Sequence, residues 1–279
     1  MTSIDIKAHR NRIENINALP TVPSTLKRIS AIIEKPKLTI DELSHFIAND
    51  PALASRVLKM VNSAIYGFPG RISSISHAIM LLGLNVVKGL LLGTSIFEIM
   101  QKVMKGLWDH SLGCAVACRV IAEKLGLKYP EEVSVAGLLH DLGKVILILE
   151  YQKAYEEAIV DAKEKGIAIS EAERVHFQET HAAVGMWLSQ KWRLPVNLID
   201  VMAYHHRPTA AKFAPLETAI VHFSDILVRA RGLGFAGDPY VPAVHPVAFE
   251  MLRLSDDDIR DVLAKMDDSL EQTADLSEL

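Results

Sequence analysis

The chain has 279 residues, 49% of them hydrophobic, which is enough for a large buried core in one domain or two. Its formal net charge of −4 gives no general field that would attract nucleic acid or an anionic membrane. The N-terminus has no apolar core of signal-peptide length, and no apolar run reaches the roughly 18 residues of a membrane span. We therefore expect a cytoplasmic protein that does not enter a membrane.

Apolar residues recur at intervals of three and four along nearly the whole chain, which predicts an all-α fold. Helix starts carry polar caps, and Thr39 with Glu42 three residues later has the pattern of a capping box. In chain order the expected caps are Ser24, Thr39, Asp50 before Pro51, and Ser73 or Ser76, with a further helix after Gly83.

In the second half we expect helices at 107–125, 131–149, 151–165, 170–175, 180–192, 196–206, 215–231 and 255–272. The stretch 232–246 is dense in glycine and proline and predicts a loop. The predicted organisation is an N-terminal helical half (1–105), a metal-binding helical half (106–231), and a loop with a C-terminal helix (232–279). We expect the two halves to pack together through the apolar helices of 76–92.

A second interpretation of the N-terminal half is a DNA-binding helix-turn-helix, because 39–61 has the required length and apolar spacing. The basic residues of its second helix, however, are only Arg56 and Lys59, and the chain as a whole carries a net negative charge. Ordinary helix packing is the better interpretation, and the composition argues against a nucleic-acid partner.

The two cysteines, Cys114 and Cys118, stand four apart in an expected helix, where a disulfide between them would strain the backbone. Reduced thiols fit a cytosolic protein. Both continue the helical face of His110, so a thiolate metal site is geometrically conceivable. We expect instead that they fill space as small buried apolar residues.

The strongest chemical signal is an ordered series of histidines and aspartates in the second half. Imidazole and carboxylate groups suit divalent Fe, Mn, Ni or Zn, and one carboxylate can bridge two ions. We therefore expect one or two transition-metal ions, with Asp141 as the bridging residue. The series consists of His110, His140, Asp141, His181, His205, His206 and Asp225.

Each of these residues has a simpler explanation when taken alone, as a hydrogen-bonded group of the core. Asp141 and Asp225 are nevertheless surrounded by apolar residues, where an unpaired carboxylate is costly to bury. One of the pair His205 and His206 could serve structure only. His222 and His176 lie outside the series, and packing or surface roles are expected for them, with His222 the weaker alternative ligand.

Lys144 follows His140 by one helical turn and would share its helix face, which suits a cation that contacts a phosphate oxygen. The alternative is a solvated helix lysine. Arg207 could act in the same way from a loop. If the protein is an enzyme, Asp141 and Lys144 are the expected catalytic residues.

Three segments of the N-terminal half, LPTVPSTLKRI, DELSHFIANDPALASRVLKMVNSAIYG and RISSISHAIMLLGLNVVKGLLLG, resemble the HD-related output domain (HDOD) family. The order in WDHS, GLLHDLGK, ETHAAVG, MAYHHRP and FSDIL is similar to that of HD-type metallophosphohydrolases. The resemblance implies a multi-helical HD-like bundle, and it implies that the metal ligands are His110, His140, Asp141, His181, His205, His206 and Asp225. HD-GYP phosphodiesterases add a Gly-Tyr-Pro motif after the paired histidines and sometimes a glutamate before the first, whereas this chain has neither, with Gly106 at the latter position.

The two resemblances imply different functions. The HDOD resemblance implies a signal-transduction output protein that works with a signalling protein partner, and no sensory domain is evident, so input would come through another chain. The metal-site resemblance implies an active metal-dependent phosphohydrolase or phosphodiesterase that acts on a nucleotide or cyclic dinucleotide. We favour the regulatory function and retain the enzyme as the alternative.

Overall fold

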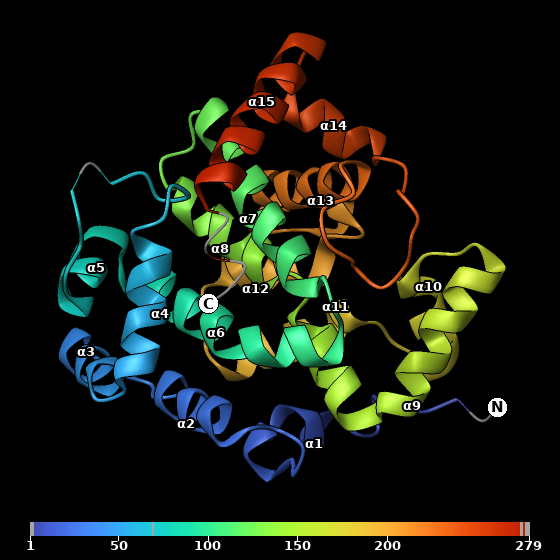
Figure 1. Cartoon of the computed structure of the whole chain (residues 1–279). Coiled ribbons are helices and arrows are strands. Elements are labelled where there is room, and N and C mark those ends of the chain that lie inside the picture. The colour runs from blue at the N-terminus through green and yellow to red at the C-terminus, as the bar shows by residue number, and fades with distance from the viewer. Residues whose placement is uncertain (1–2, 69, 274–275, 277–279) are drawn as a thin grey trace.

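The protein is described by a computed structural model that covers residues 3–68, 70–273 and 276, and no strand occurs among them (Figure 1). The all-α prediction is confirmed. The first half contains α1 (Arg10–Glu14), η1 (Ile16–Ala18), α2 (Ser24–Ile33), α3 (Ile40–Ala48), α4 (Pro51–Val61), α5 (Ile75–Leu82) and α6 (Leu84–Val103). The second half contains α7 (Leu107–Lys124), α8 (Pro130–Leu139), α9 (Leu142–Lys165), α10 (Ile169–Phe177), α11 (His181–Lys191), α12 (Val196–Tyr204), η2 (Pro208–Ala210), α13 (Pro215–Ala230), α14 (Pro246–Leu252) and α15 (Asp256–Gln272).

Two of the expected caps form as the sequence predicts. Thr39 makes the reciprocal capping box with Glu42, and the Asp50 carboxylate accepts a hydrogen bond of 3.2 Å from the backbone N–H of Leu53. Because these bonds satisfy donors that the first helical turn leaves unpaired, they fix the starts of α3 and α4.

The other two expected starts are corrected by the structure. Ser24 is the first residue of α2, with Pro23 at the capping position and no side-chain cap. The cap of α5 is Ser74, which accepts from the N–H of His77, instead of Ser73 or Ser76. A row of serines offers several equivalent capping groups, and Ser74 is the one that holds the extended backbone before the helix.

The helix expected at 131–149 is broken at His140 and Asp141, because α8 ends at Leu139 and α9 begins at Leu142. Asp141 lies outside helical geometry, with φ −95° and ψ 7°. The sequence pattern is apolar on both sides of the break and therefore gave no sign of it. Both side chains consequently lie at a junction between two helices.

The two halves of the chain pack directly on each other. A Cβ at Gly89 of α6 would lie 2.2 Å from a methyl group of Val135 in α8, and one at Gly93 would lie 2.6 Å from Leu138. Only glycine, which has no Cβ, permits this approach, so α6 packs closely on α8. The expectation that 76–92 joins the halves is confirmed for α6, and a single apolar core runs through both.

The helix-turn-helix alternative finds no support in α4. This helix buries Leu53, Val57 and Met60 against the core and packs on α6, while Arg56 is ion-paired with Glu98 of α6. A recognition helix needs a free basic face, and α4 instead behaves as an ordinary packed helix.

Candidate metal centre

The helices at the centre of Figure 1, α7, α8, α11, α12 and α13, bring the predicted ligands to one place. The donor atoms fall into two groups, and within each group they lie within 4.8 Å of one another. The first group holds His110, Cys114, His140 and Asp225, and the second holds Asp141, His181, His205 and His206. All seven predicted ligands are therefore together, and Cys114 joins them.

Asp141 connects the two groups. Its Oδ2 lies 3.3 Å from Nε2 of His140 and 3.7 Å from Nε2 of His110, both in the first group. Its Oδ1 lies 3.2 Å from Nε2 of His181 and 3.9 Å from Nε2 of His205, both in the second. A carboxylate in this position has the geometry that a bridging ligand requires.

Helix ends orient the imidazoles. His140 follows α8, and its Nδ1 donates a hydrogen bond of 2.7 Å to the carbonyl oxygen of Gly137. His205 follows α12, and its Nδ1 lies 3.1 Å from the carbonyl oxygen of Met202. In each ring Nδ1 is bonded to a carbonyl oxygen of the preceding helix, so Nε2 is the nitrogen that faces the cluster.

Several buried polar atoms lack a hydrogen-bond partner among the described residues. They include Nε2 of His140 and Oδ1 of Asp141. A buried polar atom without a partner is costly, and such atoms are rare in stable proteins. Imidazole nitrogens and carboxylate oxygens are also donors that transition metals accept. The residues present therefore fit a bound metal.

Lys144 lies within this cluster and is not solvated, since its side chain is 0% exposed. Its Nζ donates to Oδ2 of Asp141 at 2.5 Å and to the carbonyl oxygen of Ala236 at 2.8 Å. Burial alone would raise the pKa of Asp141, but His140, the Lys144 ammonium and the hydrogen bonds from His140 and His181 together hold that pKa well below its usual value. Asp141 is thereby kept ionised, as a ligand must be.

Arg229 is a functional neighbour that the sequence analysis missed. Its Nε donates to Oδ1 of Asp225 at 2.8 Å, and its other end contacts Asp238 at 3.1 Å. Burial would raise the pKa of Asp225, but Arg229, followed by His110, lowers it well below the usual value. The available signal was the spacing of four residues between Asp225 and Arg229 on one helix.

Glu173 is the second residue that was missed. This fully buried carboxylate accepts three hydrogen bonds. They come from Nδ1 of His181 at 2.6 Å, from the His181 backbone N–H at 2.9 Å and from the hydroxyl of Tyr155 at 2.7 Å. Burial opposes the imidazolium form of His181, yet the Glu173 charge and the hydrogen bonds with Asp141 and Glu173 together outweigh it and raise the pKa of that histidine. Carboxylates bound to the far nitrogen of a histidine commonly orient metal ligands. Its charged sequence context gave no sign of burial.

The two histidines outside the series have the structural roles expected for them. Nδ1 of His222 donates a hydrogen bond of 2.8 Å to the carbonyl oxygen of His205, and its Nε2 accepts one from the backbone N–H of His245. His176 pairs with Asp161 at 2.9 Å. His222 therefore holds the chain around His205 and offers no nitrogen to the cluster.

The expected loop 232–246 covers the cluster instead of hanging free. The N–H of Phe235 donates to the carbonyl oxygen of Gly106, and Ala236 accepts from Lys144. Gly106 has φ +91°, and a Cβ there would lie 2.9 Å from the nitrogen of Phe235. A glutamate at this position would therefore be strained and would collide with the loop, which agrees with its absence from the sequence.

A surface cleft of about 600 Å³ reaches His206, the one predicted ligand that is only partly buried. Arg174 and Arg207 line it, together with Lys7, which pairs with Glu179 at 2.8 Å. The cleft is thus the side from which a solute could approach the second group.

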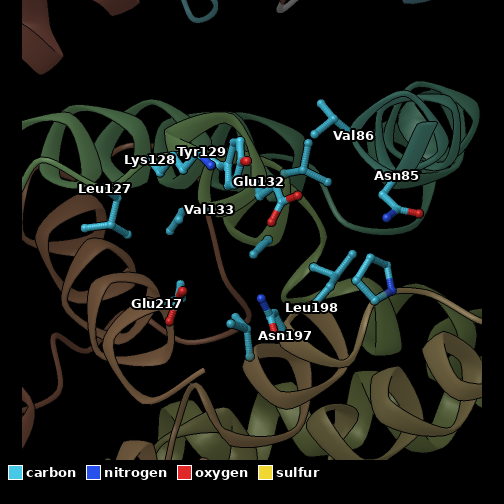
Figure 2. A pocket seen from close by; sticks show the side chains of 14 residues that line it. Asn85, Val86, Leu127, Lys128, Tyr129, Glu132, Val133, Asn197, Leu198 and Glu217 are labelled. Carbon is cyan, nitrogen blue, oxygen red and sulfur yellow. The ribbon is translucent and has the colours of Figure 1, made fainter. Parts of the chain in front are cut away.

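A separate pocket of about 180 Å³ is lined by residues of α6, α8, α12 and α13 and of the segments next to them (Figure 2). Its lining includes Val86, Ala136, Leu198 and Val201. No predicted site residue lines it.

These features define an all-α protein with an enclosed histidine and aspartate centre. The HDOD domain model matches residues 19–208, and the chain belongs to the HDOD family. A crystal structure of an HDOD domain protein of unknown function from Geobacter sulfurreducens has a TM-score of 0.69, at 30% identity over 98% of this chain and 99% of that one.

Two further matches are a solved structure that shares the fold and a sequence relative. A crystal structure from Marinobacter aquaeolei VT8, provisionally named a signal transduction protein, has a TM-score of 0.65 at 18% identity, over 100% of this chain and 62% of that one. An uncharacterized protein of Treponema pallidum (strain Nichols) is 27% identical over 77% of this chain. The match spans 43% of that relative, less than half of its length. No helix in the described part of the chain is long and apolar enough to cross a membrane.

Proposed function

We propose that this protein is a signal-transduction output module whose centre binds one or two divalent transition-metal ions in a structural or sensory role. The burial of the ligands carries the proposal. His110, His140, Asp141, His181 and His205 are all 0% exposed, and Asp225 is 2% exposed. Structural metal sites are closed in this way, whereas catalytic sites keep a position open to solvent or substrate.

When bound, a metal would supply positive charge at the point where several helices converge. The residues of the chain prepare for it: Lys144 and Arg229 keep the two aspartates ionised, and Glu173 orients His181. A change in metal occupancy would alter how tightly α7, α11 and α13 are held. A signalling protein in contact with these helices would sense that change, in the cytoplasm, where the two free cysteines stay reduced.

The test begins with metal analysis of protein purified without added metal. Asp141→Ala should remove the metal and lower the thermal stability, because a ligand that binds only the native state stabilises it. Asp200→Ala is the matched control. Asp200 is also a buried aspartate, 4% exposed, but it accepts hydrogen bonds from the backbone of 212–214, outside the cluster.

Asp200→Ala should destabilise the protein and leave the metal content of folded protein unchanged. Metal-free wild-type protein that gains no stability from added Mn²⁺, Fe²⁺, Ni²⁺ or Zn²⁺ would contradict the proposal. Equal metal loss in both variants would show that unfolding, and not lost ligation, removes the metal.

The cleft at His206 favours a second candidate, a metal-dependent phosphohydrolase for a nucleotide or cyclic dinucleotide. Arg174 and Arg207 line this cleft and have no ion-pair partner among the described residues, so they are free to bind an anion. A bound metal would supply Lewis-acid stabilisation of charge on phosphate. The contact of Lys144 with phosphate remains a prediction. The Lys144 ammonium is bonded to Asp141 and would have to contact phosphate in addition to that carboxylate.

Metal-loaded protein is then screened with phosphomonoesters, nucleotides and cyclic dinucleotides. Turnover of about 1 s⁻¹ or faster, within the ordinary range for enzymes, would favour the hydrolase. Asp141→Ala would then abolish that turnover, and Lys144→Ala would reduce it and also weaken metal binding, because Lys144 keeps Asp141 ionised. We expect metal-dependent stability without such turnover.

A further inference from the structure

Cys114 lies where a metal ligand would lie. It follows His110 by one turn of α7, it is fully buried, and its Sγ is 3.6 Å from Nε2 of His110. Its sulfur also lies within 4.8 Å of donor atoms of His140 and Asp225. The spacing of Cys114 and Cys118 from His110 allowed a thiolate site at either cysteine, and the structure brings only Cys114 into the donor group.

We propose that Cys114 is a metal ligand and that it completes a four-donor site with His110, His140 and Asp225. The proposal rests on the metal-binding part of the proposed function. Four protein donors suit a closed tetrahedral site. Nε2 of His140, fully buried and without a hydrogen bond among the described residues, is available to the same site.

The separations of the donors agree with a shared ion. Metal–nitrogen and metal–sulfur bonds of about 2.0–2.3 Å place two ligands of one ion roughly 3–4 Å apart. Nε2 of His110 lies 3.2 Å from Oδ1 of Asp225 and 3.6 Å from Sγ of Cys114. Arg229 holds the Asp225 carboxylate in this position.

A sulfur ligand changes the metal preference of the first group. Thiolate favours Zn²⁺ and similar soft ions over Mn²⁺ and Mg²⁺, whereas the second group offers only imidazole and carboxylate. On binding, the thiol proton is released to solvent and a metal–sulfur bond forms without any change of oxidation state. The two groups would then differ in chemistry, the first being the more selective for zinc.

Co²⁺ titration of metal-free protein tests this directly, because a cobalt–thiolate bond gives a near-ultraviolet charge-transfer absorption that nitrogen and oxygen ligands do not. Wild-type protein should show the band, and Cys114→Ala should lose it. Cys118→Ala is the matched control and should keep it. Cys118 is equally buried on the next turn of α7, but its sulfur is not in either donor group.

We also expect Cys114→Ala to weaken Zn²⁺ binding at least tenfold while Mn²⁺ binding changes little. Wild-type protein that binds Co²⁺ without the band would overturn the role of Cys114 and leave the metal centre standing. Loss of the band in Cys118→Ala alone would do the same. Wild-type protein that binds no metal at all would overturn both proposals.

The pocket in Figure 2 carries an independent inference, because it is built by the helices that lead into the metal centre. Ala136 lies on α8 one turn before His140, and Val201 lies on α12 one turn before His205. The pocket also touches α6 through Val86, so it spans both halves of the chain. An occupant would contact several helices that position ligands.

The charge in this pocket is negative and uncompensated. Glu132 and Glu217 both line it, and neither carboxylate has an ion pair or hydrogen bond among the described residues. Partial burial, Glu131 and then Glu217 raise the pKa of Glu132. The one lysine of the lining, Lys128, has its ammonium 4.9 Å from the centre of the Tyr129 ring.

We infer that this pocket binds a small organic cation, a primary alkylammonium with a short apolar body. The apolar side chains of the lining would contact its carbon chain, and the two glutamates would pair with its nitrogen. A cation bound there would change the metal affinity of the neighbouring centre, and by linkage the metal would change the affinity for the cation by the same factor.

Titration with n-butylammonium, 1-butanol and butanoate, followed by NMR shifts of the metal-free protein, separates charge from apolar contact. Butylammonium should bind most tightly. Glu132→Gln and Glu217→Gln should each weaken it about threefold, as expected for partly exposed ion pairs. Glu250→Gln is the matched control, since Glu250 neither lines the pocket nor belongs to the charges that shift the pKa of Glu132, and it should have no such effect.

Tighter binding of butanoate than of butylammonium, or equal weakening by all three variants, would overturn the inference about the ligand. In the metal-loaded protein, an unchanged affinity for butylammonium would overturn the coupling to the centre. The ligand test uses no metal, so its outcome is independent of the proposed function.

Discussion

The contact between α9 and α11 predicts that Gly143→Ala will unfold the protein more easily than any comparable change nearby. A Cβ at Gly143 would lie 2.0 Å from the carbonyl oxygen of His181 and 2.9 Å from the nitrogen of Gly185. Both of those atoms belong to the backbone of α11, so no side chain can turn aside. One methyl group must therefore push the two helices apart at the metal centre.

The expected cost follows from the kind of atom that is met. Overpacking usually costs about 1–3 kcal/mol, and a backbone collision belongs at the upper end, at about 3 kcal/mol. For a chain of this size each kcal/mol lowers Tm by about 2–4 °C, so Gly143→Ala should lower it by roughly 6–12 °C. Because the carbonyl of His181 must move, metal binding should weaken as well.

Gly185→Ala is the matched control on the facing helix. A Cβ there would lie 3.3 Å from the terminal methyl of Met202, a flexible side chain that can move away. Both substitutions gain similarly in helix propensity, so their difference isolates the backbone collision. Thermal unfolding followed by circular dichroism, with chelator present, gives both values. A Tm for Gly143→Ala within about 2 °C of that for Gly185→Ala would refute the reasoning.

Three further outcomes follow from the structure. Glu173→Gln should weaken metal binding about 10–100-fold, measured by chelator competition, because His181 loses its charged partner; a change below about twofold would contradict that role. Burial, and then neighbouring histidines, lower the pKa of His205 and His206. These two imidazoles therefore bind protons more readily in the unfolded chain than in the folded one. Metal-free protein should accordingly lose stability as pH falls below about 6.5, although the raised pKa of His181 offsets part of the loss; a flat Tm between about pH 7 and pH 5 would count against it. Trp192→Phe removes an indole hydrogen bond of 2.8 Å to α2 and should cost about 1 kcal/mol in urea unfolding, whereas an unchanged midpoint would show that the bond contributes nothing.

The sequence by itself determined the helical class, most helix boundaries and the set of candidate ligands. Helical periodicity and capping are local properties, so α3 and α4 begin where Thr39 and Asp50 predict. The order of histidines and aspartates is also readable without coordinates. The structure then places all seven predicted residues in one cluster, from His110 in α7 to Asp225 in α13.

Only the tertiary structure decided how that cluster is closed and supported. The break at Asp141, the burial of Lys144 and the covering loop 232–246 all depend on contacts between segments far apart in the chain. Glu173 likewise becomes a partner of His181 only because α10 packs on α9 and brings a charged segment into the core. Periodicity reports which face of a helix is apolar, but it carries no information about which buried polar groups will meet. That information resides in the packing of one helix against another.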